Sequence, residues 1–121
     1  MLDVNLNGTD HDFSLAQVGF VYYLGSGVSG TQTFQNTTSL HTLAWGGAGT
    51  NTFIGGPGSD EFIGGTGNNT FNAGSGFDMF IGGTGSNVFD ESLTGSGMID
   101  EIGKNNTLNV PPGSSGSYQV F

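Results

Sequence analysis

Phenylalanine recurs every nine residues through the middle of the chain, at Phe53, Phe62, Phe71, Phe80 and Phe89. Each is the eighth residue of a nonapeptide that reads Gly, Gly, any residue, Gly, any residue, Asp or Asn, any residue, Phe, any residue, with single departures in a few copies. The glycine-rich first six residues favour a tight turn with positive φ angles, and the last three favour a short strand. Because side chains alternate along a strand, we expect each phenylalanine to point inward and its two neighbours to point outward.

Five such nonapeptides run without interruption from Gly46 to Asp90. Two of them make one coil of a solenoid, and stacked coils lie about 4.8 Å apart, so residues two nonapeptides apart lie above one another. The spacing therefore predicts an all-β fold, a parallel β-solenoid with about 18 residues per coil and glycine-rich turns stacked along two edges. It also predicts two inner columns, one of Phe53, Phe71 and Phe89 and one of Phe62 and Phe80.

The flanking segments contain weaker copies of the unit, so we predict a single solenoid domain over residues 1–121. SGTQTF at 29–34 parallels AGTNTF at 48–53, and the segment that ends at Leu108 parallels the one that ends at Phe71, with one residue inserted. Residues 1–45 are expected to form irregular coils or a cap, with one or two longer strands in the apolar stretch 13–24. Residues 91–121 are expected to form degenerate coils or a cap.

The nonapeptide resembles the GGxGxDxUx repeat of the RTX (repeats-in-toxin) family, where U is a large apolar residue. The resemblance implies a right-handed parallel β-roll that binds Ca²⁺. Alternate units lie on opposite edges of such a roll, so the sixth residues of the units form two columns. One column holds Asn51, Asn69 and Asn87, and the other holds Asp60 and Asp78.

In the family, a calcium ion lies between two stacked turns of one edge and is bound by carboxylates and backbone carbonyls, the oxygen ligands that Ca²⁺ prefers. The resemblance thus implies one site, made by Asp60 with the carbonyls of Gly56 and Gly58, and by Asp78 with the carbonyls of Ala73 and Ser75. The alternative is that both aspartates cap their own turns in solvent. On the other edge we expect a column of hydrogen-bonded asparagine amides without metal.

Ten acidic residues stand against a single base, Lys104. This balance opposes binding to nucleic acid or to an anionic membrane surface, and no apolar run is long enough for membrane insertion. The chain has no cysteine, which excludes disulfides and thiolate metal sites. No GxSxG elbow, HExxH motif or paired carboxylates indicate catalysis, so we expect neither an enzyme nor a small-molecule substrate.

These features predict a secreted, extracellular structural protein that assembles as a homo-oligomer or filament into a fibre, lattice or matrix. Strand edges at the ends of a solenoid favour head-to-tail addition. The outward side chains of Ile63, Met79 and Ile81 predict an apolar strip that is covered either by a terminal segment or by another molecule. The first residues lack the pattern of a cleaved signal peptide, and the resemblance implies type I secretion.

Two other functions stay open. The chain is alternatively the folding and secretion module of a larger type I secreted effector, as RTX repeats are elsewhere. A lesser alternative is an ice-binding solenoid, which would use rows of polar side chains on the asparagine edge that include Thr50, Thr66 and Thr84.

Overall fold

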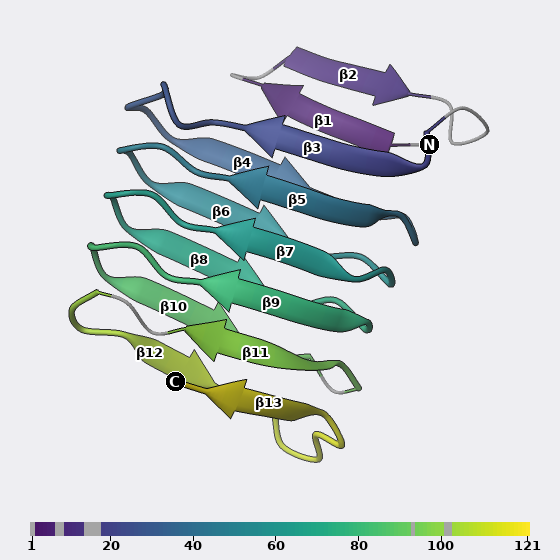
Figure 1. The fold of residues 1–121 in the computed structure, drawn as a ribbon, viewed down its shortest axis with the longest axis vertical. Helices are drawn as coiled ribbons and strands as arrows, with labels where there is room; N and C mark the ends of the chain where they lie inside the picture. The colour runs from purple at the N-terminus through teal and green to yellow at the C-terminus, as the bar shows by residue number, and fades with distance from the viewer. Residues whose placement is uncertain (1, 7–8, 14–17, 93, 101–102) are drawn as a thin grey trace.

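The computed structural model describes residues 2–6, 9–13, 18–92, 94–100 and 103–121. The regular elements of these residues are all β-strands. After an N-terminal hairpin, the chain passes from one parallel sheet to the other with each strand, and the two sheets face each other as the walls of a stacked solenoid (Figure 1). The predicted fold class is confirmed.

The two walls contain six and five strands. The six-stranded sheet, called here the odd sheet, has the spatial order β13 (Ser117–Val120), β11 (Ser96–Asp100), β9 (Phe77–Ile81), β7 (Asp60–Ile63), β5 (His41–Trp45) and β3 (Phe20–Leu24). The five-stranded even sheet has the order β12 (Thr107–Asn109), β10 (Asn87–Asp90), β8 (Asn69–Asn72), β6 (Asn51–Ile54) and β4 (Gln32–Gln35). An antiparallel hairpin of β1 (Leu2–Leu6) and β2 (Thr9–Phe13) lies at the N-terminal end of the stack, with β1 against β4 (Figure 1).

The predicted register holds throughout the regular repeats. Strand β8 pairs with β6 and β10 so that Phe71 lies beside Phe53 and Phe89, each two nonapeptides away along the chain. These rings stack at centroid distances of 5.2 and 5.0 Å, and Phe62 and Phe80 form a second ladder at 5.7 Å. The two ladders touch each other, with 5.3 Å between the rings of Phe53 and Phe62. All five rings are at most 1% exposed, so the core is a double ladder of aromatic rings.

The coils outside the repeats are longer. Phe20 pairs with His41 and Ser96 pairs with Ser117, and both of these steps exceed the length of two nonapeptides. Phe34 pairs with Phe53, and Leu108 pairs with Phe89. Both weak copies of the repeat therefore continue the inner column of Phe53, Phe71 and Phe89, as predicted. The hairpin of β1 and β2 was not predicted, because antiparallel pairing does not follow from a solenoid period. Of the apolar stretch 13–24, residues 14–17 lie outside the described residues, and residues 20–24 form β3.

We expected the turn glycines of the repeats to adopt positive φ angles, and they do not. Among the described residues, the glycines with positive φ are Gly103 and Gly113, which lie outside the repeats. A Cβ on Gly74 would instead lie 1.7 Å from the carbonyl oxygen of Gly56 in the next coil. A Cβ on Gly65 would lie 1.8 Å from that of Gly47. A side chain would push the stacked turns apart, so these glycines are required by the close approach of two backbones.

We predict that Phe71→Ala lowers the free energy of unfolding by about 3–5 kcal/mol, because it opens a cavity between two stacked rings. Thr70→Ala is the matched control, since this neighbouring side chain points outward and is half-buried; its expected cost is about 0.5 kcal/mol. Urea unfolding followed by circular dichroism measures both variants. Equal losses would contradict the aromatic ladder as the main source of stability.

Candidate metal site

The asparagine edge is a ladder of buried amides. Asn51 Nδ2 donates to Oδ1 of Asn69 at 2.8 Å, and Asn69 Nδ2 donates to Oδ1 of Asn87 at 2.8 Å. The same nitrogens also donate to carbonyls of their own turns, as Asn51 does to Gly47 at 3.1 Å and to Gly49 at 3.2 Å. The geometry confirms the expected column of hydrogen-bonded amides.

The aspartate edge places carboxylates at the positions that amides occupy on the other edge. Asp60 and Asp78 precede an inward phenylalanine by two positions in β7 and β9, so their side chains also face inward. They are 1% and 0% exposed, which excludes turn caps in solvent. Asp60 Oδ2 accepts the N–H of Gly56 at 2.9 Å, and Asp60 Oδ1 accepts Nδ2 of Asn36 at 2.9 Å. Asp78 Oδ1 accepts the N–H of Asp60 at 3.0 Å.

The predicted carbonyl ligands belong to two turns that are in direct contact. The N–H of Ser75 donates to the carbonyl of Gly56 at 3.2 Å. Ala73 begins the same turn as Ser75, directly after β8, and Gly58 follows Gly56 in the other turn. All six residues predicted for the site therefore lie in these two turns or at the start of the strands that follow them.

The exchange of amide for carboxylate removes N–H donors from this edge. On the other edge, an asparagine nitrogen donates to the turn carbonyls four and two residues before it, as Asn87 does to Gly83 at 3.0 Å and to Gly85 at 3.3 Å. The residues at the same offsets from Asp60 are Gly56 and Gly58, and an ionised carboxylate has no proton to give their carbonyls. The two carboxylates thus add acceptor oxygens to this edge without the side-chain N–H donors that asparagine would bring, and such a set of oxygen ligands fits Ca²⁺.

The electrostatics of Asp78 also favour a bound cation. Burial raises the pKa of the Asp78 carboxyl to about 6, the Asp60 carboxylate adds to the rise, and the backbone amides of Asp60 and Gly74 offset part of it. Asp78 Oδ2 is buried and makes no hydrogen bond of regular geometry to any described residue. Lys104, the chain's one base, is exposed. The ionised pair therefore lacks a balancing positive charge in the interior.

The rungs next to the pair differ in part from the sequence pattern. Thr42 pairs with Asp60, as the spacing of two nonapeptides predicts. Gly97 rather than Ser96 pairs with Asp78, because the step from β9 to β11 is one position longer than two nonapeptides. The repeat pattern did not predict that Asn36 takes part in the site, because Asn36 lies in an irregular coil outside the repeats. Its Nδ2 donates to Asp60 and also to Thr42 Oγ1 at 2.8 Å.

A parallel β-solenoid with an inward column of carboxylates beside an aromatic ladder defines a class of repeat protein. Residues 45–80 match the family model of the RTX calcium-binding nonapeptide repeat, in four copies. This match confirms the resemblance over residues 45–80, and nonapeptide repeats of this family are calcium-binding. No curated protein and no solved structure matches the chain. In the described residues, no helix is long and apolar enough to cross a membrane.

We predict that, without calcium, the stability contributed by Asp78 falls as the pH rises from about 4 to about 6. The carboxyl binds its proton more tightly in the folded protein than at its ordinary pKa of 3.8, so this contribution is fully present below pH 4 and is lost above pH 6. The loss should be on the order of 1–3 kcal/mol.

The measurement is denaturant unfolding between pH 4 and 7 in chelator, with Asp78→Asn as the control for all other titrating groups. The free energies of unfolding of the two proteins should diverge over this pH range. A constant difference between them would contradict the buried, proton-binding state of Asp78. Saturating calcium should abolish the fall, because an ion between the two turns would bind the ionised carboxylate.

Proposed function

We propose that Ca²⁺ binds between the turn of residues 55–60 and the turn of residues 73–78 and stabilises the solenoid. The observation that carries this proposal is the pair of buried carboxylates on adjacent rungs, of which Asp78 Oδ2 makes no hydrogen bond of regular geometry within the described residues. Asp60 and Asp78 would supply charged ligands, and carbonyls of the two turns would supply neutral ones. The ion offsets the repulsion between the carboxylates and replaces the protons that amides provide on the other edge.

The proposed role of the protein is structural and extracellular. Among the described residues, no group of three or more His, Asp or Glu side chains converges on one point, so backbone carbonyls would have to complete the shell. A site with two carboxylates and otherwise neutral oxygens fits the weak calcium affinities of extracellular modules, about 10⁻⁴–10⁻³ M, so the site would fill outside the cell. Proteins that carry RTX repeats are typically secreted, and we propose type I secretion as the route.

Removal of calcium should lower the unfolding midpoint, and its return should restore it. The gain follows RT ln(1 + [Ca²⁺]/Kd), which is about 2.7 kcal/mol at a hundredfold excess over Kd. Asp60→Asn combined with Asp78→Asn should erase the response, because amides can satisfy the turn carbonyls themselves. Asn69→Ala is the control: it should destabilise the protein and leave the calcium increment intact. If the double variant keeps the increment, the ion binds elsewhere.

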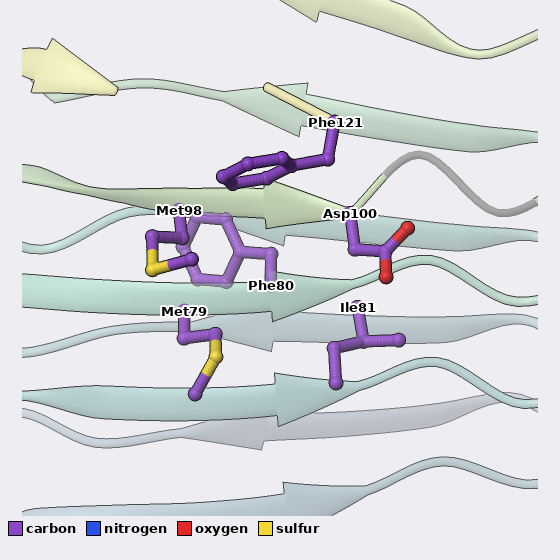
Figure 2. Close-up of a pocket in the computed structure, with 6 residues that line it drawn as sticks. All are labelled: Met79, Phe80, Ile81, Met98, Asp100 and Phe121. Carbon is purple, nitrogen blue, oxygen red and sulfur yellow. The ribbon is translucent and has the colours of Figure 1, made fainter. Parts of the chain in front are cut away.

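We further propose that copies of the chain associate through the outer surface of the odd sheet. The apolar face consists of the outward side chains Tyr22, Leu24, Trp45, Ile63, Met79 and Ile81. Tyr22 and Leu24 are each 56% exposed and Trp45 is 43% exposed. Phe121 lies over the C-terminal end of this surface and borders an open pocket of about 350 Å³ (Figure 2). Because the side chains repeat with the strand spacing, a second solenoid is the partner whose spacing matches them.

Association should be visible by analytical ultracentrifugation and electron microscopy in the presence of calcium. Ile63→Lys should shift the protein toward monomers, since it places a charge in the apolar face. Asn72→Lys is the matched control, because residue 72 holds the same repeat position on the outer surface of the even sheet. Monodisperse monomers of the unmodified protein with and without calcium would remove self-association.

The two alternative functions, a module of a larger secreted effector and an ice-binding solenoid, are also supported by observations. A calcium-stabilised module of this kind would also serve a larger secreted effector. An outward column on the even sheet contains Thr33, Thr52, Thr70 and Thr107, with Val88 between the last two. This regular hydroxyl row is the feature that favours ice binding, although it lies on the sheet rather than on the turns that the sequence pointed to.

A further inference from the structure

The outer surface of the odd sheet carries two columns of side chains that the strand register aligns from one end of the stack to the other. The column at the middle of the strands, called here the glutamate column, consists of Tyr22, Leu43, Glu61, Met79, Met98 and Gln119. The column next to it, called here the tryptophan column, consists of Leu24, Trp45, Ile63, Ile81 and Asp100, with Phe121 beside Asp100.

The two ends of this surface differ in shape. At the N-terminal end, Tyr22 and Leu24 are each 56% exposed and Trp45 is 43% exposed. At the C-terminal end, the open pocket of about 350 Å³ lies over β9 and β11, with Met98 and Asp100 in its lining (Figure 2). One end of the surface therefore presents large exposed side chains, and the other end is hollowed.

A second copy can meet this surface face to face with two-fold symmetry in two ways. A two-fold axis along the stack places each strand opposite its own equivalent, whereas an axis along the strands reverses the order of the coils. The first arrangement brings Glu61 opposite Glu61 of the second copy, in a chain whose net charge is already -9. It also brings exposed end against exposed end and leaves the two hollows facing each other. The reversed arrangement avoids both the like charges and the void.

The reversed arrangement matches unlike groups along both columns. In a sheet of six strands, it places β3 opposite β13, β5 opposite β11 and β7 opposite β9 of the second copy. Glu61 then faces Met79 rather than another carboxylate. Trp45 faces Asp100, which is the charged residue of the pocket lining, so the indole N–H can donate to the carboxylate while its rings enter the apolar hollow.

We propose that two copies pack their odd sheets face to face with their coils in opposite order, and that Trp45 of each copy enters the pocket beside Asp100 of the other. This inference rests on the self-association under the proposed function and adds its geometry. Because each copy uses the same surface, the contact closes on itself. The odd sheet therefore forms dimers, and a filament would need a different surface.

The fluorescence of Trp45 tests the contact, because Trp45 is the only tryptophan of the chain. As the protein is concentrated in calcium, its emission should shift to shorter wavelength and its quenching by acrylamide should be lost, while ultracentrifugation shows dimers. Met98→Lys places a charge in the pocket and should abolish these changes. Val88→Lys is the matched control, since residue 88 also precedes an inward residue but lies on the outer surface of the even sheet.

Crosslinking tests the order of the coils. The chain has no cysteine, so Tyr22→Cys and Gln119→Cys each introduce a single thiol. These positions lie at opposite ends of the glutamate column and face each other only when the coils run in opposite order. A bismaleimide that spans about 10 Å, the distance between packed sheets, should join the two variants in an equimolar mixture. Either variant alone should stay uncrosslinked.

Crosslinks within Tyr22→Cys alone would overturn the inference, because equivalent strands would then face each other. A dimer in which Trp45 stays open to acrylamide would overturn it as well, since the interface would lie elsewhere. Both results would leave self-association itself intact. Monomers at every concentration, by contrast, would remove the self-association under the proposed function together with this geometry.

Discussion

The fixed distance of about 4.8 Å between strands of successive coils is the constraint on which the structure depends. At this distance identical rings stack face to face, and the planes of Phe53, Phe71 and Phe89 deviate by 8° and 6° from parallel. The two aromatic ladders fill the space between the sheets. The residue two positions earlier faces the same interior, and in the repeats it is polar. Each coil must therefore provide hydrogen-bond partners for a buried polar side chain that lies about 4.8 Å from the equivalent side chain of the next coil.

The two edges meet this requirement by different chemistry. An amide carries both donor and acceptor, so a column of asparagines satisfies itself from Asn51 to Asn87. A carboxylate carries acceptors only, so a column of aspartates needs protons, donors from neighbours or a cation. Under the proposed function, the choice of Asn or Asp at the sixth position thus determines which edge would depend on calcium. The fold itself is shared, because both columns rest on the same aromatic core.

The nonapeptide period was sufficient to predict the strands, the register, the inner phenylalanines and the stacking of Asp60 with Asp78. It failed where coils contain insertions, because the sequence does not reveal where an extra residue is absorbed. A step of two nonapeptides from Asp78 leads to Ser96, whereas Gly97 is the residue that pairs with Asp78. Asn36 was missed for the same reason. The role of the turn glycines was also misjudged, since the distance between coils belongs to the stack and cannot be read from one repeat.

The ends of the aspartate column explain why it is short. A ladder of acceptors must be completed at both ends, and at the N-terminal end Asn36 does so by donating to Asp60 at 2.9 Å. At the C-terminal end Gly97 pairs with Asp78 and has no side chain, so that rung offers the carboxylate no side-chain donor. Each additional aspartate rung would add a buried negative charge without adding a donor. A column of two rungs, with an amide before them, limits the negative charge in the interior, and the asparagine column extends further because it has no such limit.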